Sequence, residues 1–112
     1  MANGNDIHPD AEAELRTLAM DGQHGKGVGK CLRLMHVWCN EGFPPDAEST
    51  DEEIEWRLPR VDRSPLLGVI LEREDVVFWT SVGGATSTLL AVGTFMEERS
   101  NEAVFQRAVA RM

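Results

Sequence analysis

Hydrophobic positions in the first third of the chain recur with helical spacing. Pro9 suits the first turn of a helix, and apolar residues follow three or four positions apart until Gly22, where a left-handed cap can end it. A second amphipathic pattern starts at Val28 and stops at Gly42. Its apolar positions are Val28, Cys31, Leu32, Met35, Trp38 and Cys39. The sequence therefore predicts two helices, preceded by a flexible lead-in over residues 1–7.

The pattern changes to a period of two near residue 54. Ile54, Trp56 and Leu58 alternate with charged residues, which predicts a half-buried strand. Three further strands are predicted at Leu66 to Leu71, Val76 to Val82 and Thr86 to Met96, with Gly83-Gly84 as a hairpin turn. Ser100 can then cap a last helix. Its apolar face comprises Val104, Phe105, Ala108, Val109 and Met112.

The predicted order is two helices, three or four strands and a closing helix. Short connections between strands favour an antiparallel meander. With its helices on one face, such a sheet gives a two-layer α+β fold. A chain of 112 residues is long enough for one domain and too short for two, so residues 8–112 are predicted to form a single domain.

Composition and cysteine spacing indicate a soluble protein of the cytoplasm. Neither end carries a targeting signal, and the longest nearly uncharged stretch, Val76 to Met96, is too rich in Ser, Thr and Gly for a membrane span. Cys31 and Cys39 lie eight residues apart in one predicted helix. Their Cα atoms would be roughly 12 Å apart, too far for a disulfide.

The acidic residues are concentrated in one segment. The chain carries a net charge of −8, and residues 46–62 hold seven acids and two bases, a net charge of −5. Long-range repulsion opposes the binding of free nucleic acid. This charge instead favours a protein partner that docks on the acidic side chains. We expect that surface to comprise Asp46, Glu48, Asp51, Glu52, Glu53 and Glu55.

The stretch GQHGKGVGKC, residues 22–31, looks like a phosphate-binding loop but departs from that motif. A Walker loop needs glycine where His24 stands and Ser or Thr where Cys31 stands, and it must follow a strand rather than a helix. We predict a flexible connection between two helices instead. His36 and Cys39 could supply two metal ligands, but a structural zinc needs four, so no metal and no cofactor is expected.

Four arginines lie on or beside the predicted sheet: Arg57, Arg60, Arg63 and Arg73. They could hold a phosphate or an RNA backbone through charge-assisted hydrogen bonds. Alternatively, they pair with the acids at 46–55 and 72–75, which the surplus of acid favours. A small-molecule site near Arg57 and Trp79 is a further alternative, because an α+β layer can form a pocket.

The C-terminal segment LLAVGTFMEERSNEAVFQRAVARM, residues 89–112, resembles the RelE/HigB toxin superfamily, including its phage-derived branch. The resemblance rests on an apolar strand with a phenylalanine, two charged residues, and a helix bearing alanine and arginine. It covers roughly residues 8–112 and implies a RelE-like fold. It also implies an enzyme that cuts messenger RNA in the ribosomal A site, using basic residues on the sheet and often a Tyr or His.

The chain departs from that family pattern where catalysis would occur. Glu97-Glu98 replaces the expected lysine pair, the chain has no Tyr, and no His follows His36. The remaining candidates for phosphate contact are Arg57, Arg60, Arg63, Arg73 and Arg99. We therefore expect a catalytically degenerate protein that binds a protein partner, either a host protein or a cognate antitoxin. The alternative is an active ribosome-dependent mRNA endoribonuclease of a toxin–antitoxin pair.

Overall fold

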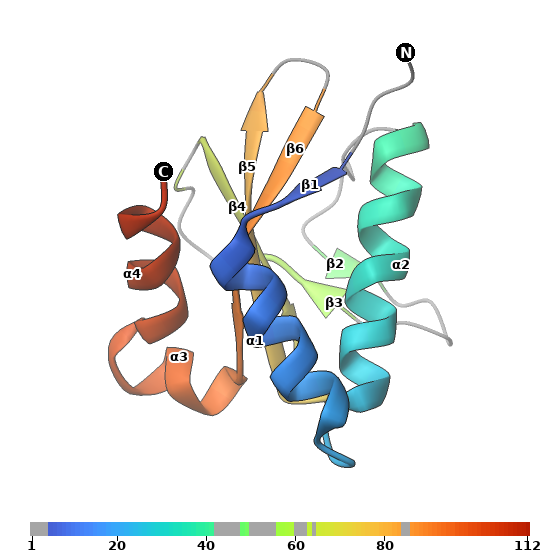
Figure 1. Ribbon diagram of the computed structural model, residues 1–112, viewed down its shortest axis with the longest axis vertical. Coiled ribbons are helices and arrows are strands. Elements are labelled where there is room, and N and C mark those ends of the chain that lie inside the picture. Colours follow the sequence, from blue (N-terminus) through green and yellow to red (C-terminus); the bar gives the residue numbers. More distant parts are fainter. Residues whose placement is uncertain (1–4, 42–47, 50–55, 60–62, 64, 84–85) are drawn as a thin grey trace.

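The computed structural model describes residues 5–41, 48–49, 56–59, 63, 65–83 and 86–112. Within these ranges the strands form one six-stranded sheet in the order β1-β6-β5-β4-β3-β2 (Figure 1). The strands are β1 (Asn5–Ile7), β2 (Glu48–Ser49), β3 (Trp56–Arg57), β4 (Leu66–Leu71), β5 (Val76–Gly83) and β6 (Thr86–Gly93). β1 is parallel to β6 and all other neighbours are antiparallel. The predicted α+β fold with an antiparallel meander is confirmed.

Helices cover both faces of this sheet, so the predicted two-layer arrangement is wrong. α1 (Pro9–Met20) and α2 (Gly25–Glu41) pack on one face, against a cluster that includes Val69 and Phe78. The opposite face, with Ile70, Val77 and Trp79, packs against α4 (Ala103–Ala110). The reason lies in β4 and β5, whose apolar residues are continuous rather than alternating, as expected of strands buried on both faces.

The chain enters the fold earlier than predicted. Residues 5–7, expected in a flexible lead-in, form β1 and pair with residues 87–89 of β6. The His8 backbone N–H then donates to the Leu89 carbonyl at 2.9 Å, and the His8 Nδ1 accepts from the Asp10 N–H as the N-cap of α1. Only residues 1–4 of that lead-in lie outside the described part of the chain.

The last strand ends three residues before the predicted Met96. Thr94 is the N-cap of α3 (Phe95–Asn101), and its side chain and that of Glu97 form a reciprocal capping box. Ser100, the predicted cap, lies inside this helix. Glu102 adopts a left-handed conformation, with φ of 56°, and separates α3 from α4. The predicted C-terminal helix is therefore confirmed as α4, and α3 is an additional helix over residues predicted to end the last strand and to cap the helix after it.

The glycine-rich stretch belongs to a helix rather than to a loop. α2 begins at Gly25, so the connection between the first two helices covers only residues 21–24. A Cβ on Gly27 would lie 2.5 Å from Val76 Cγ2 and 2.9 Å from Glu74 Cβ. Glycine is required there because α2 approaches the β4–β5 turn so closely. A Cβ on Gly29 would meet nothing within 4 Å.

These two glycines predict opposite effects of the same substitution. Gly29→Ala should stabilise the protein by about 0.5–1 kcal/mol, because alanine loses less backbone entropy in a helix. Gly27→Ala should destabilise it by about 1–3 kcal/mol, because the added methyl overlaps the β4–β5 turn. Urea denaturation of both variants measures the difference. Equal stabilisation by both substitutions would contradict the close approach of α2 to this turn.

Candidate functional site

Two of the arginines predicted to contact phosphate, Arg57 and Arg63, bind the chain's own side chains. Arg63 forms a two-pronged ion pair with Glu102, with N–O distances of 2.5 and 3.1 Å, and its guanidinium lies 4.1 Å from the Phe105 ring centroid. Arg57 donates to Glu72 at 3.3 Å and lies 5.4 Å from the Phe95 ring centroid. The predicted pairing of sheet arginines with the acids at 72–75 is confirmed for Arg57.

The other predicted cations have different placements. Arg99 is exposed on α3 and lies over the Phe95 ring at 5.7 Å, so it shares that ring with Arg57. Arg73 is exposed in the β4–β5 turn. Arg60 lies outside the described residues. The structure thus places Arg57 and Arg99 on one ring and Arg63 on another.

The acidic residues have two different placements. Glu48 lies in β2, the edge strand of the sheet, whereas Asp46, Asp51, Glu52, Glu53 and Glu55 lie outside the described residues. Glu97 and Glu98, which stand where the RelE/HigB resemblance predicts a lysine pair, support the C-terminal helices. Glu98 accepts hydrogen bonds from Trp79 Nε1 at 2.5 Å and from the Phe105 N–H at 3.1 Å. The carboxylates of both residues therefore have structural partners beside the C-terminal helices.

The charged groups around the glycine-rich stretch also have internal partners. Lys30 Nζ lies 2.5 Å from Glu74 Oε1. Buried His24 places Nδ1 3.0 Å from Asp21 Oδ2 and Nε2 3.2 Å from Asp75 Oδ2. Burial alone would lower the pKa of His24, but the hydrogen bonds to Asp75 and Asp21 together raise it above its usual value. These contacts fasten α2 to the β4–β5 turn and support the rejection of a nucleotide loop.

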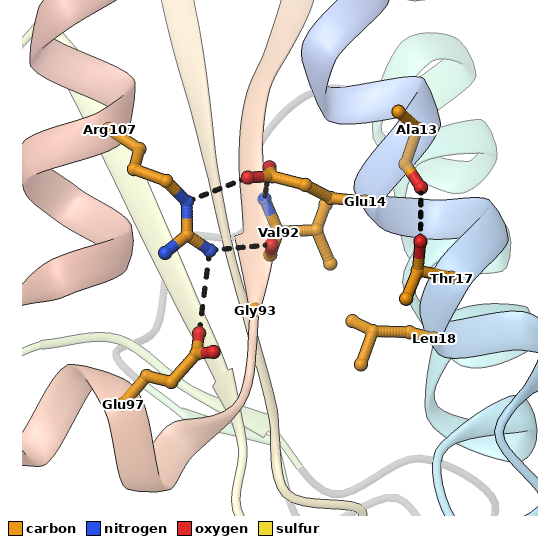
Figure 2. Close-up of a pocket in the computed structure, with 8 residues that line it drawn as sticks. All are labelled: Ala13, Glu14, Thr17, Leu18, Val92, Gly93, Glu97 and Arg107. Atoms are coloured by element: carbon orange, nitrogen blue, oxygen red, sulfur yellow. Dashed lines mark hydrogen bonds and ion pairs between the residues drawn. The ribbon is translucent and has the colours of Figure 1, made fainter.

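Three charged residues that were not singled out from the sequence, Glu14, Arg107 and Arg111, complete the free edge of β6; Figure 2 shows Glu14 and Arg107 beside Val92. β6 pairs with β5 along one side, and β1 pairs with residues 87–89 along the other side. On that second side, the later backbone groups of β6 have no partner strand among the described residues. The Glu14 carboxylate accepts from the Val92 N–H at 3.0 Å. Arg107 donates to the Val92 carbonyl at 3.0 Å, and Arg111 donates to the Leu90 carbonyl at 2.9 Å. Side chains from α1 and α4 therefore satisfy groups that a neighbouring strand would otherwise pair.

The Glu14 carboxylate also forms ion pairs with both arginines. Glu14 lies 2.7 Å from Arg107 Nε and accepts from both terminal nitrogens of Arg111 at 2.8 and 3.1 Å. Desolvation would raise the pKa of Glu14. Hydrogen bonds from Arg111 and the Val92 amide, with the charges of both arginines, outweigh it, and the pKa lies below 4.5. We call Glu14, Arg107 and Arg111 the edge clamp.

A hollow of about 380 Å³ lies beside the edge clamp. It is lined by Ala13, Glu14, Thr17, Leu18, Val92, Gly93, Glu97 and Arg107 (Figure 2). A Cβ on Gly93 would come within 2.5 Å of Glu97 Oε2 and 2.6 Å of Arg107 Nη2, so glycine is required for these side chains to meet. Every charged group on its wall is engaged in a contact within the chain. The hollow is therefore primarily a structural junction.

The spacing of the clamp residues carried a signal that sequence reasoning missed. Glu14 lies three residues after Ala11 and four before Leu18, beside the apolar stripe of α1. Arg107 and Arg111 are four residues apart and border Ala108 in α4. Charged side chains at the border of two apolar stripes indicate ion pairs between packed helices, but the partner cannot be read from spacing alone.

Metal and thiol chemistry receive no support from the described residues. No group of three or more His, Cys, Asp or Glu side chains in this part of the chain is arranged to hold a metal ion. Cys31 is buried and unpaired, and desolvation raises the pKa of its thiol far above the usual value. Cys39 lies in α2, but its side chain is outside the described set. No described helix is both long enough and apolar enough to cross a membrane.

Comparison of the chain with protein-family models, curated proteins and solved structures finds no match. The resemblance of residues 89–112 to the RelE/HigB superfamily therefore stays a prediction from the sequence. Independently of that resemblance, the structure shows that Arg57 and Arg63 form ion pairs within the chain and that the edge clamp lies on β6.

The edge clamp predicts a large effect of a nearly isosteric substitution. Glu14→Gln should destabilise the protein by about 2–3 kcal/mol at neutral pH, because two partly buried guanidinium groups lose their counter-charge. Glu12→Gln is the matched control. Glu12 pairs with Arg16 on the exposed face of the same helix, and that change should cost less than about 0.5 kcal/mol.

The difference in unfolding free energy between wild type and Glu14→Gln should also depend on pH. The pKa of Glu14 is lower in the folded protein than in the unfolded chain, so its ionised carboxylate stabilises the fold at neutral pH. This stabilisation is lost as the pH falls through the folded pKa. The gap between wild type and Glu14→Gln, measured by urea denaturation, should therefore narrow on acidification. A gap that stays constant down to acid unfolding would contradict the ionised clamp.

Proposed function

We propose that this chain is a RelE/HigB-like protein of phage or mobile-element type that binds a protein partner in the cytoplasm and does not cleave RNA. The observation that carries the proposal is the engagement of the sheet arginines by the chain itself. Arg63 is held by Glu102 and Phe105, and Arg57 by Glu72 and Phe95. Cations held in this way are poorly placed to stabilise charge on a scissile phosphate.

The energetics support the same conclusion for Arg63. Its guanidinium makes two hydrogen bonds to one carboxylate and stacks on an aromatic ring. Charge-assisted bidentate pairs are stronger than ordinary hydrogen bonds, and their geometry restricts the guanidinium to one orientation. A phosphate would have to displace Glu102 and would also face Glu98, which is fixed close by through Trp79 and the Phe105 amide.

The partner is expected to be basic because the chain is acidic. Its net charge is −8, and the acid-rich residues 46–55 include Glu48 in the edge strand β2. Charge of one sign near a sheet edge speeds encounter with a partner of opposite sign and disfavours nucleic acid. A host protein and a cognate antitoxin are both compatible with this chemistry.

Ribosome-dependent cleavage of mRNA, the alternative function, is tested by translating a reporter mRNA with purified protein and mapping its ends by primer extension. We expect no new ends with wild type. Cleavage by wild type that is lost in a folded Arg63→Ala variant and retained in Arg16→Ala would contradict the proposal. Arg16 is a suitable control because its side chain is exposed and pairs only with Glu12 among the described contacts.

Binding of a basic partner to the acidic segment is tested with a matched pair of double variants. Quantitative mass spectrometry of cross-linked host lysate should recover a basic partner with wild type and lose it with Glu52→Ser/Glu53→Ser. The control Asp6→Ser/Glu12→Ser removes the same charge from exposed positions in β1 and α1. Equal loss in both double variants, or in neither, would refute docking through the acidic segment.

A further inference from the structure

Helix α3 is held in place mainly by polar contacts, and Phe95 is its one side chain packed against the core cluster among the described residues. None of its seven residues is buried. The capping box of Thr94 and Glu97 satisfies its first turn, and Asp75 adds two contacts from the β4–β5 turn. The Asp75 carbonyl accepts from the Phe95 N–H at 3.3 Å, and its carboxylate accepts from the Met96 N–H at 3.1 Å. The helix is therefore fixed, and the side chains of Met96, Arg99 and Ser100 on it are exposed.

The outer side chains of α3 combine an apolar surface with an unneutralised positive charge. Met96 is 71% exposed. Arg99, one turn further on, is exposed, and among the described residues its guanidinium contacts the Phe95 ring and no carboxylate. Arg57 approaches the same ring at 5.4 Å, so two guanidinium groups share one aromatic side chain. The only described carboxylate paired with Arg57 belongs to Glu72, which is 62% exposed.

A hollow of about 360 Å³, lined by Met96, Arg99 and Ser100, lies on this surface. We propose that α3 is a docking site for an acidic peptide segment of a partner protein. A carboxylate of the segment pairs with Arg99, and a neighbouring aliphatic side chain packs on Met96. Arginine and methionine are both enriched in the cores of protein interfaces, and the flexible thioether adapts to varied apolar partners.

The surroundings favour a peptide over an RNA strand. Glu97 is exposed beside Met96, Glu72 lies next to Arg57, and the chain carries a net charge of −8. Each nucleotide brings another phosphate into this field, whereas a peptide can bring one or two carboxylates between apolar residues. The site does not depend on the proposed acidic surface at residues 46–55, which would contact a partner of opposite charge.

The test titrates the full chain with a fluorescein-labelled peptide that carries two glutamates between leucines. Parallel titrations use its glutamine analogue and a labelled oligouridylate of similar length. We expect fluorescence anisotropy to report binding of the acidic peptide, with amide shift changes in NMR centred on residues 95–101. Arg99→Gln should weaken binding about tenfold, the effect of losing one charge-assisted contact. Met96→Ser should also weaken it, and Arg16→Gln should leave it unchanged.

Three outcomes would overturn the docking site. The first is an acidic peptide that causes no shift changes at residues 95–101. The second is equal binding of the glutamate and glutamine peptides, or equal loss in Arg99→Gln and Arg16→Gln. The third is oligouridylate binding that is tighter than peptide binding and depends on Arg99, which would assign the surface to RNA.

Discussion

The contact on which the fold most depends is the Glu14 carboxylate at the free edge of β6. It accepts a hydrogen bond from the Val92 amide and forms ion pairs with both Arg107 and Arg111. Because α1 and α4 lie on opposite faces of the sheet, this one side chain connects both helical layers to the strand between them. It also protects part of a strand edge that would otherwise be open to pairing with another chain.

Ion pairs with the same role recur on the α3–α4 face. Arg63 and Glu102 fix the junction between the two short helices, and Glu98 ties α3 to Trp79. Arg63 and Glu98 are thus used to fasten α3, which has no buried residue, to the rest of this face. This engagement within the chain is the reason why we propose a protein partner rather than RNA.

Periodicity predicted the first two helices, the β4–β5–β6 meander and the α+β fold, because those features follow from local spacing. The second helical layer was missed although LLGVIL and VVFW are apolar on both faces, and the Thr94–Glu97 capping box was overlooked in favour of Ser100. The pairing of Arg57 with the acids at 72–75 was anticipated from the excess of acid. The edge clamp could not be predicted, because Arg111 lies 97 positions and the Val92 amide 78 positions from Glu14, and they meet only in the folded sheet.

Amide hydrogen exchange at Val92 tests the central role of Glu14 most directly. Val92 is paired with Phe78 in register, but its own N–H points to Glu14. In a Glu14→Ala variant that remains folded, the Val92 amide should exchange much faster than in wild type, whereas the Phe78 amide in the central strand should change only with global stability. Equal protection of Val92 in both proteins, relative to Phe78, would contradict the account.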